Sequence, residues 1–106
     1  MSAFPWEERE EILAGAALLA HATDRGMAGK PPLELDLAAL PPSAIVGDLI
    51  YTPPETPLLA VARARGNLTV NGLCLLLNQA RPAFRTWFDV MPEITPELVK
   101  AVEATF

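Results

Sequence analysis

Cysteine and histidine are almost absent from this sequence. Among its 106 residues, Cys74 is the one cysteine and His21 the one histidine. A single thiol excludes an internal disulfide and a multi-cysteine metal site, and with only one histidine we expect no metal site of any kind. A Cys–His nucleophile pair is not expected, nor is a Ser–His–acid triad, because no Gly-x-Ser-x-Gly turn is present.

Long apolar runs and clusters of basic residues are also missing. The longest apolar stretches, Leu13–Ala20 and Leu73–Leu77, are far shorter than the ~18 residues that span a bilayer. The formal net charge is −5 and the basic residues are dispersed, so we expect neither nucleic acid nor an anionic membrane as a partner. Met1–Arg9 contains no basic stretch followed by an apolar one, which indicates a cytoplasmic protein without a secretory signal.

The first half of the chain predicts a helix, a strand and a long connection. A chain of this length can build one small core. Glu7–Leu13 has helical spacing, and the apolar run Ala16–Ala20 suits a buried parallel strand. The segment 29–42 contains four prolines and predicts a crossover along the surface, with a helical turn at Leu37–Leu40.

The middle of the chain predicts a β-α-β unit. Ala44–Tyr51 is rich in β-branched residues and is stopped by prolines, as expected of a strand. Thr56 followed by Pro57 is typical of a helix start, and Gly66 of a helix end. With Leu68–Val70 as the next strand, the connection is expected to be right-handed and the sheet parallel.

Two further helices, 72–88 and 96–105, are predicted at the end of the chain. Apolar residues recur at helical spacing from Gly72 to Phe88, and Pro82 predicts a kink because it cannot donate to the carbonyl of Asn78. Thr95 repeats the cap signal before the last helix. The pattern therefore predicts an α/β fold of about three parallel strands with flanking helices. Three strands are few for an independent domain of this class, and both faces of a parallel sheet are normally covered by helices.

Four segments, in order along the chain, resemble one family. His21–Met27 (HATDRGM) is similar to an Asn-Ala-Thr-Pro-x-Gly-Met turn, and Gly47–Tyr51 (GDLIY) with Glu55–Leu59 (ETPLL) to a Tyr-Asp-x-x-Tyr strand and its Thr-Pro helix start. Asn71–Gln79 (NGLCLLLNQ) is similar to Asp-Gly-Leu-Gly-Met-Leu-x-x-Gln, which Ala83–Trp87 continues. Together these motifs resemble the C-terminal part of shikimate dehydrogenases.

The resemblance implies a fold, a cofactor and a substrate. Residues 1–106 would form a single C-terminal fragment of a dinucleotide-binding domain, a partial Rossmann-like (doubly wound) fold. The parent reaction would be the NADP-dependent interconversion of 3-dehydroshikimate and shikimate. The resemblance assigns NADP contacts to Thr23, Leu49, Gly72 and Leu75, and shikimate contacts to Tyr51 and Gln79. It assigns no catalytic residue and no metal ligand to this sequence.

The sequence also departs from the family pattern. His21, Asp24, Asn71, Cys74 and Leu75 replace the usual Asn, Pro, Asp, Gly and Met. The catalytic Lys and Asp of the family have no counterpart here, nor does a Gly-x-Gly-x-x-Gly phosphate turn. We therefore expect a chain that positions ligands and does not catalyse hydride transfer alone.

Other interpretations stay open at this point. A non-catalytic binding module, or a chain that associates with itself through an exposed sheet edge and an apolar helix, would also fit the pattern. Thr23 and Gly72 are equally typical of a turn and a helix start. Tyr51 fits an exposed aromatic at the end of a strand, and Gln79 an exposed helix residue. His21 fits a hydrogen-bonded core or edge residue, and Cys74 a small buried hydrophobe.

Overall fold

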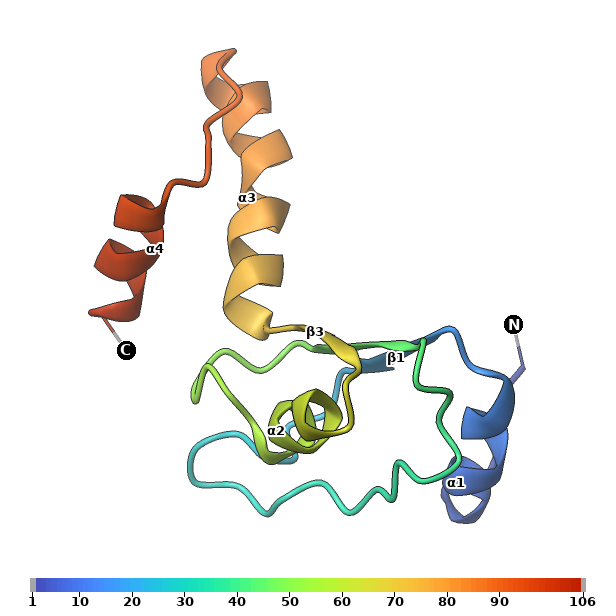
Figure 1. Cartoon of the computed structure of the whole chain (residues 1–106). Coiled ribbons are helices and arrows are strands. Elements are labelled where there is room, and N and C mark those ends of the chain that lie inside the picture. The colour runs from blue at the N-terminus through green and yellow to red at the C-terminus, as the bar shows by residue number, and fades with distance from the viewer. Residues whose placement is uncertain (1, 106) are drawn as a thin grey trace.

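The protein folds into a small α/β layer from which a helical arm projects (Figure 1). A computed structural model describes residues 2–105. Its elements are η1 (Trp6–Glu8), α1 (Arg9–Ile12), η2 (Leu13–Gly15), β1 (Leu18–His21), β2 (Ile45–Asp48), α2 (Pro57–Ala64), β3 (Leu68–Val70), α3 (Gly72–Phe88) and α4 (Pro96–Glu103).

The sheet has three parallel strands in the order β1-β2-β3, which confirms the predicted fold class. β2 ends at Asp48, three residues before the expected end at Tyr51. The reason is a change of hydrogen-bond partners. The N–H of Ile50 donates to the side chain of Asp48, and the carbonyl of Ile50 accepts from Gly72 at the start of α3. One further bond to β1 follows Asp48, from the Leu49 N–H to the His21 carbonyl, and after it the Asp48 side chain and Gly72 replace the strand ladder.

One face of the sheet is covered by α2, the crossover and the N-terminal helical segment. The core on this face combines Val46 with Leu59 and Ala62 of α2 and with Leu13. The crossover contributes as well, because Leu37 and Leu40 are only 2% and 1% exposed. The prediction of a surface crossover was thus wrong for these two leucines. Their side chains pack into the core on this face of the sheet, where a longer helix would otherwise lie. The helical turn expected there is present, since Leu40 N–H donates to the Leu37 carbonyl.

Asn67 fastens the crossover to the end of α2. Its buried side-chain amide donates to the carbonyls of Pro41, Pro42 and Ala44 at 3.1, 3.3 and 2.9 Å. Its amide oxygen accepts from Arg65 at 2.8 Å. The proline-rich segment is not part of a helix or a strand, and this one amide satisfies three of its carbonyls.

No element of the described residues 2–105 covers the row of side chains on the opposite face of the sheet. Leu18, Ile45 and Leu68 are aligned across the three strands, and their side chains are 61%, 40% and 67% exposed. Ala20, Gly47 and Val70 form the next row. Parallel sheets are normally covered on both faces. Among the residues that the structure describes, nothing covers this apolar row, which is therefore left open to solvent.

The cap signals in the sequence mark the observed helix ends. Thr56 caps α2 by accepting from Leu59 N–H, and Thr95 caps α4 by accepting from Leu98 N–H. Gly66 follows α2 with φ +89°, a conformation that glycine adopts without strain. α3 has the predicted bounds. α4 ends at Glu103 and not at 105, because the N–H of Thr105 donates to the carbonyl of Val102 in a turn-type bond.

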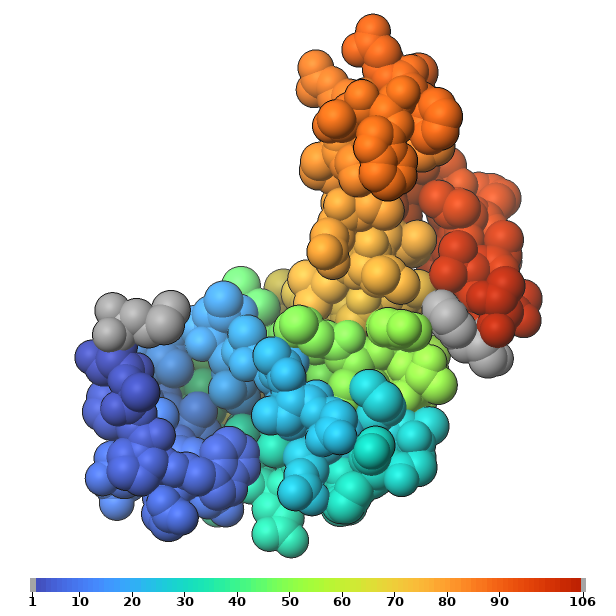
Figure 2. All heavy atoms as spheres, turned by 180° about the vertical axis from the view of Figure 1, so that it is seen from behind, coloured from blue at the N-terminus to red at the C-terminus, as the bar shows by residue number. Residues whose placement is uncertain are grey.

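α3 and α4 extend away from the layer as an arm (Figures 1 and 2). The radius of gyration is 15.7 Å, whereas a compact chain of this length has about 13 Å. In α3 only Gly72 and Leu73 are buried. The prediction that Cys74 is buried was therefore wrong: Val99 of α4 lines a hollow beside it, and the thiol is exposed. A bond from Arg81 Nε to the Pro92 carbonyl at 2.9 Å holds the α3–α4 connection.

Candidate functional site at the carboxyl edge of the sheet

An open hollow lies where β1 and β2 end. In parallel α/β sheets ligands bind at this edge, because the strands end there and the following loops diverge. The turn after β1 contributes Thr23, and the segment after β2 contributes Leu49 and Tyr51. The complete lining consists of Ala22, Thr23, Asp24, Met27, Leu49, Ile50, Tyr51 and Thr52. Three of the six predicted contact residues thus lie around one hollow.

Gly72 is packed against the backbone of the same segment. Its N–H donates to the Ile50 carbonyl at 3.1 Å. A Cβ on Gly72 would lie 2.3 Å from the carbonyl oxygen of Ile50 and 2.4 Å from that of Leu49. The space left by the missing side chain is therefore filled by the chain's own backbone. The structure thus gives the missing side chain a packing role, and the NADP contact that the family resemblance assigns to Gly72 stays a prediction.

The two remaining predicted residues, Leu75 and Gln79, lie on α3 and do not line the hollow. They are four residues apart, so they share one face of the helix. Leu75 is 38% exposed and Gln79 is also exposed. The structure therefore divides the six residues into a group at the sheet edge and a pair on the arm, with Gly72 at the junction.

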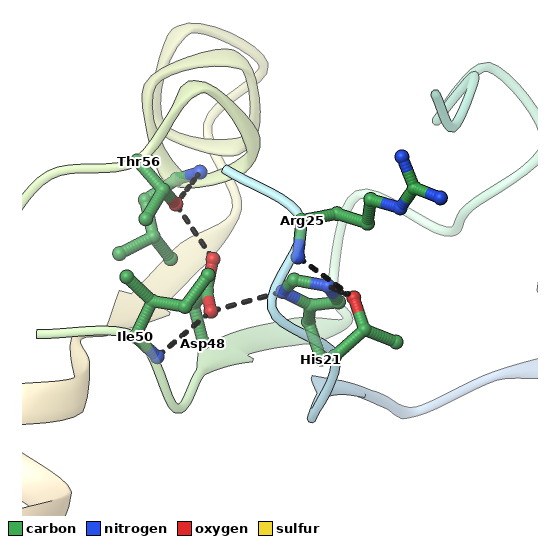
Figure 3. Close-up of polar contacts among 7 residues, drawn as sticks. His21, Arg25, Asp48, Ile50 and Thr56 are labelled. Carbon is green, nitrogen blue, oxygen red and sulfur yellow. Dashed lines mark hydrogen bonds and ion pairs between the residues drawn. The ribbon is translucent and has the colours of Figure 1, made fainter. Parts of the chain in front are cut away.

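A buried polar network lies directly beneath this edge (Figure 3). Its centre is Asp48, which is 0% exposed. Oδ1 of Asp48 accepts from Ile50 N–H at 3.1 Å and contacts His21 Nδ1 at 3.0 Å, and Oδ2 accepts from the Thr56 hydroxyl at 2.6 Å. Because Thr56 also caps α2, the carboxylate joins β1, the end of β2 and the start of α2.

His21 connects the network to the hollow. Its imidazole is 5% exposed, which confirms the prediction of a hydrogen-bonded core residue. Its second ring nitrogen, Nε2, is hydrogen-bonded to Thr23 Oγ1. Thr23 Oγ1 also accepts from Arg25 N–H at 3.2 Å. The side chain of Thr23 at the hollow is therefore held from both sides.

Sequence reasoning named His21 but missed its partner Asp48 and also missed Thr56, which donates to Asp48. One signal was available, because a carboxylate follows the apolar run Ile45–Gly47 in a strand expected to be buried. A buried charge requires hydrogen-bonding partners. The sequence alone gave no means of choosing them, since His21 lies 27 residues before Asp48.

The charges around the hollow are few. Asp24 contributes a carboxylate, which lies 3.7 Å from the ammonium of Lys30, and both side chains are more than half exposed. Screening by water makes such a pair weak. Within the described part of the chain, no group of three or more His, Cys, Asp or Glu side chains is placed to hold a metal ion. No described helix is long and apolar enough to cross a membrane.

Two curated proteins similar to this chain share one description. No protein-family model matches the chain. It is 56% identical over 97 residues to the NADP(+) shikimate dehydrogenase of Rhodospirillum rubrum, covering 92% of this chain and 34% of that protein. It is 53% identical over 100 residues to the corresponding enzyme of Acidiphilium cryptum, with coverage of 94% and 36%. The chain is homologous to shikimate dehydrogenases.

Solved structures agree with this relationship. The shikimate 5-dehydrogenase of Thermus thermophilus, in complex with NADP(H) and shikimate, matches with a TM-score of 0.77 and 30% identity, covering 100% of this chain and 39% of that one. Quinate dehydrogenase of Corynebacterium glutamicum, in complex with NAD, matches with a TM-score of 0.80 and 32% identity over 92% of this chain and 34% of that one. This chain thus spans about a third of the length of the relatives that it matches.

Proposed function

We propose that this chain supplies the ligand-positioning sheet edge of an NADP-dependent shikimate dehydrogenase in the cytoplasm, and that it does not catalyse the reaction alone. The reaction is the interconversion of 3-dehydroshikimate and shikimate. The observation that carries the proposal is the hollow at the ends of β1 and β2, where Thr23, Leu49 and Tyr51 meet. The identity to curated shikimate dehydrogenases extends over more than nine-tenths of the chain and includes this edge.

The proposed contacts follow from the chemistry of the side chains. Thr23 and the backbone of Leu49 contact NADP at the sheet edge. The Tyr51 phenol and the Gln79 amide contact shikimate, because both groups can donate to hydroxyl and carboxylate oxygens and can accept from hydroxyl groups. Gly72 and Leu75 complete the cofactor contacts from the first turns of α3. For the two groups of residues to act on one ligand, the ligand has to bridge the sheet edge and the arm.

The absence of catalysis is proposed on the basis of the groups around the hollow. Hydride transfer between NADP and the carbon that bears the hydroxyl requires a side chain that takes or returns the hydroxyl proton. No lysine lines the hollow, and its one carboxylate belongs to Asp24, which is exposed to water. Asp48 is fully buried and engaged in three hydrogen bonds. This supports a positioning role without proton transfer.

The purified chain is expected to form no NADPH from NADP and shikimate, while shikimate still shifts the NMR signals of Tyr51 and its neighbours. Tyr51→Phe should weaken shikimate binding about fivefold to tenfold, the effect of losing about one hydrogen bond. Val61→Ala, at an exposed position of α2, is the control and should leave binding unchanged. NADPH formation that Gln79→Ala abolishes would contradict the proposed inactivity. Unchanged signals on adding shikimate or NADP would contradict the positioning role.

A second candidate function is self-association. The specific observation is the bare sheet face, where Leu18, Ile45 and Leu68 present one apolar row. Burying apolar surface stabilises by about 25 cal/mol per Å². Two copies that stack these faces would each provide the missing layer for the other, in an isologous dimer with two-fold symmetry.

Sedimentation across a range of concentrations tests self-association. If the bare face is the interface, the wild-type chain should form dimers, and Leu68→Lys should shift it to the monomer by placing two ammonium groups in the apolar contact. Val61→Lys introduces the same charge at another exposed apolar position, on α2, and should still dimerise. A monomeric wild-type chain, or equal effects of the two lysine variants, would contradict this alternative.

A further inference from the structure

His21 stands between a fully buried carboxylate and a side chain at the ligand hollow. Nδ1 lies 3.0 Å from Asp48 Oδ1, and Nε2 is hydrogen-bonded to Thr23 Oγ1 (Figure 3). The imidazole therefore relays the hydrogen-bonding state of the core to the Thr23 hydroxyl.

The partners of Asp48 determine which nitrogen of His21 carries the proton. The carboxylate already accepts from the Ile50 N–H and the Thr56 hydroxyl. An ionised carboxylate can only accept, so Nδ1 of His21 has to be the donor. In a neutral imidazole the other nitrogen is then an acceptor. Nε2 consequently accepts from the Thr23 hydroxyl.

In this tautomer the Thr23 hydroxyl can only accept a hydrogen bond from a ligand. A threonine hydroxyl has one proton to donate and two lone pairs. The proton is directed to His21 Nε2, and one lone pair accepts from Arg25 N–H. What remains is one lone pair. At this point of the hollow, a ligand hydroxyl or amide N–H finds a partner, and an oxyanion does not.

The surroundings of Thr23 favour the same ligands. No Lys or Arg side chain lines the hollow, and Asp24 contributes a carboxylate. Arg25 lines a neighbouring hollow that also reaches Thr23, but its guanidinium extends away from His21 (Figure 3). We propose that His21 is a positioning residue that fixes Thr23 as a hydrogen-bond acceptor, so that the hollow takes a hydroxyl- or amide-bearing part of a ligand at Thr23 and not a phosphate.

The tautomer can be measured directly, because His21 is the one histidine of the chain. In a ¹⁵N-labelled sample at about pH 8, where an unperturbed imidazole is neutral, long-range ¹H–¹⁵N spectra should show a protonated Nδ1 and an unprotonated Nε2. Thr23→Val removes the hydroxyl at nearly constant shape. It should leave Nδ1 protonated and move the Nε2 resonance toward that of an unbonded nitrogen. A protonated Nε2 in the wild-type chain would overturn the inference.

A double-mutant cycle with inorganic phosphate tests the selectivity. In His21→Asn the amide nitrogen takes the place of Nδ1 and can still donate to Asp48, but nothing reaches Thr23, whose hydroxyl becomes free to donate. Thr23→Val should therefore weaken phosphate binding about fivefold in the His21→Asn background and leave it unchanged in the wild-type background. Equal effects of Thr23→Val in both backgrounds, including no effect in either, would refute the selectivity.

Neither measurement uses NADP or shikimate. If the chain binds neither ligand, the proposed function is refuted. The NMR measurement of the His21 tautomer and the double-mutant cycle with phosphate still test this inference. If His21→Asn fails to fold, the wild-type spectrum and Thr23→Val still decide whether His21 positions Thr23.

Discussion

Replacement of Asp48 with alanine is expected to lower the free energy of unfolding by about 3–5 kcal/mol. The substitution leaves three buried donors without their acceptor: His21 Nδ1, Ile50 N–H and the Thr56 hydroxyl. Each buried donor left unsatisfied costs about 1–3 kcal/mol, and their effects overlap because they share one site. Urea unfolding followed by circular dichroism measures the loss, which is a large part of the stability of a small domain.

Asp36→Ala is the matched control for this prediction. Asp36 is exposed and its carboxylate accepts one local bond, from Ala38 N–H at 2.9 Å. Its removal should cost less than about 1 kcal/mol. Asp48→Asn keeps the shape and one acceptor oxygen, so an intermediate loss is expected. Equal losses for Asp48→Ala and Asp36→Ala would show that the network does not hold β1, β2 and α2 together.

Gly72→Ala is expected to destabilise the chain by about 2–3 kcal/mol or more, although alanine is the better helix former. The added methyl group would meet the carbonyl oxygens of Ile50 and Leu49 at 2.3 and 2.4 Å. Both are backbone atoms, so the overlap is relieved only by moving α3 or the end of β2, and overpacking of this kind is costly. Thermal unfolding should show a fall in Tm of roughly 10–20 °C.

Gly47→Ala provides the comparison for Gly72→Ala. A Cβ on Gly47 would lie 4.0 Å from the nearest backbone oxygens, which is ordinary contact. Alanine also restricts the unfolded chain more than glycine does, so no loss or a small gain in stability is expected. If the two alanine variants unfold at the same temperature, the close seat of α3 on the sheet edge is not rigid in solution.

The parts of the fold set by local signals could be predicted from the sequence. Thr56 and Thr95 mark helix starts because their hydroxyls satisfy N–H groups three residues ahead. Leu68–Val70 was predicted with its observed bounds, since a helix end and a helix start enclose it. Each of these signals involves residues that are neighbours along the chain.

The parts set by contacts distant in sequence could not be predicted. The burial of Leu37 depends on where the crossover passes over α2 and the sheet, and no local pattern contains that path. The exposure of Cys74 depends on where α4 lies beside α3, whereas its apolar neighbours favoured burial. At the site, parallel strands alone bring Thr23, Leu49 and Tyr51 to one edge of the sheet. The position of Leu75 and Gln79 on a separate arm does not follow from the strand order and could not be predicted.

The tight contact at Gly72 also anchors one end of α3, while the rest of the helix extends away from the sheet. Seventeen residues at about 1.5 Å each give a rod of about 25 Å that is fixed at one end by the Gly72–Ile50 hydrogen bond. A tilt of about 10° at this fulcrum would move the far end of the helix, at Phe88, by about 4 Å for the same rod length. A small shift of the backbone at Leu49 and Ile50 therefore produces a larger displacement at the far end of α3. The position of Trp87 consequently depends on the backbone geometry at the sheet edge.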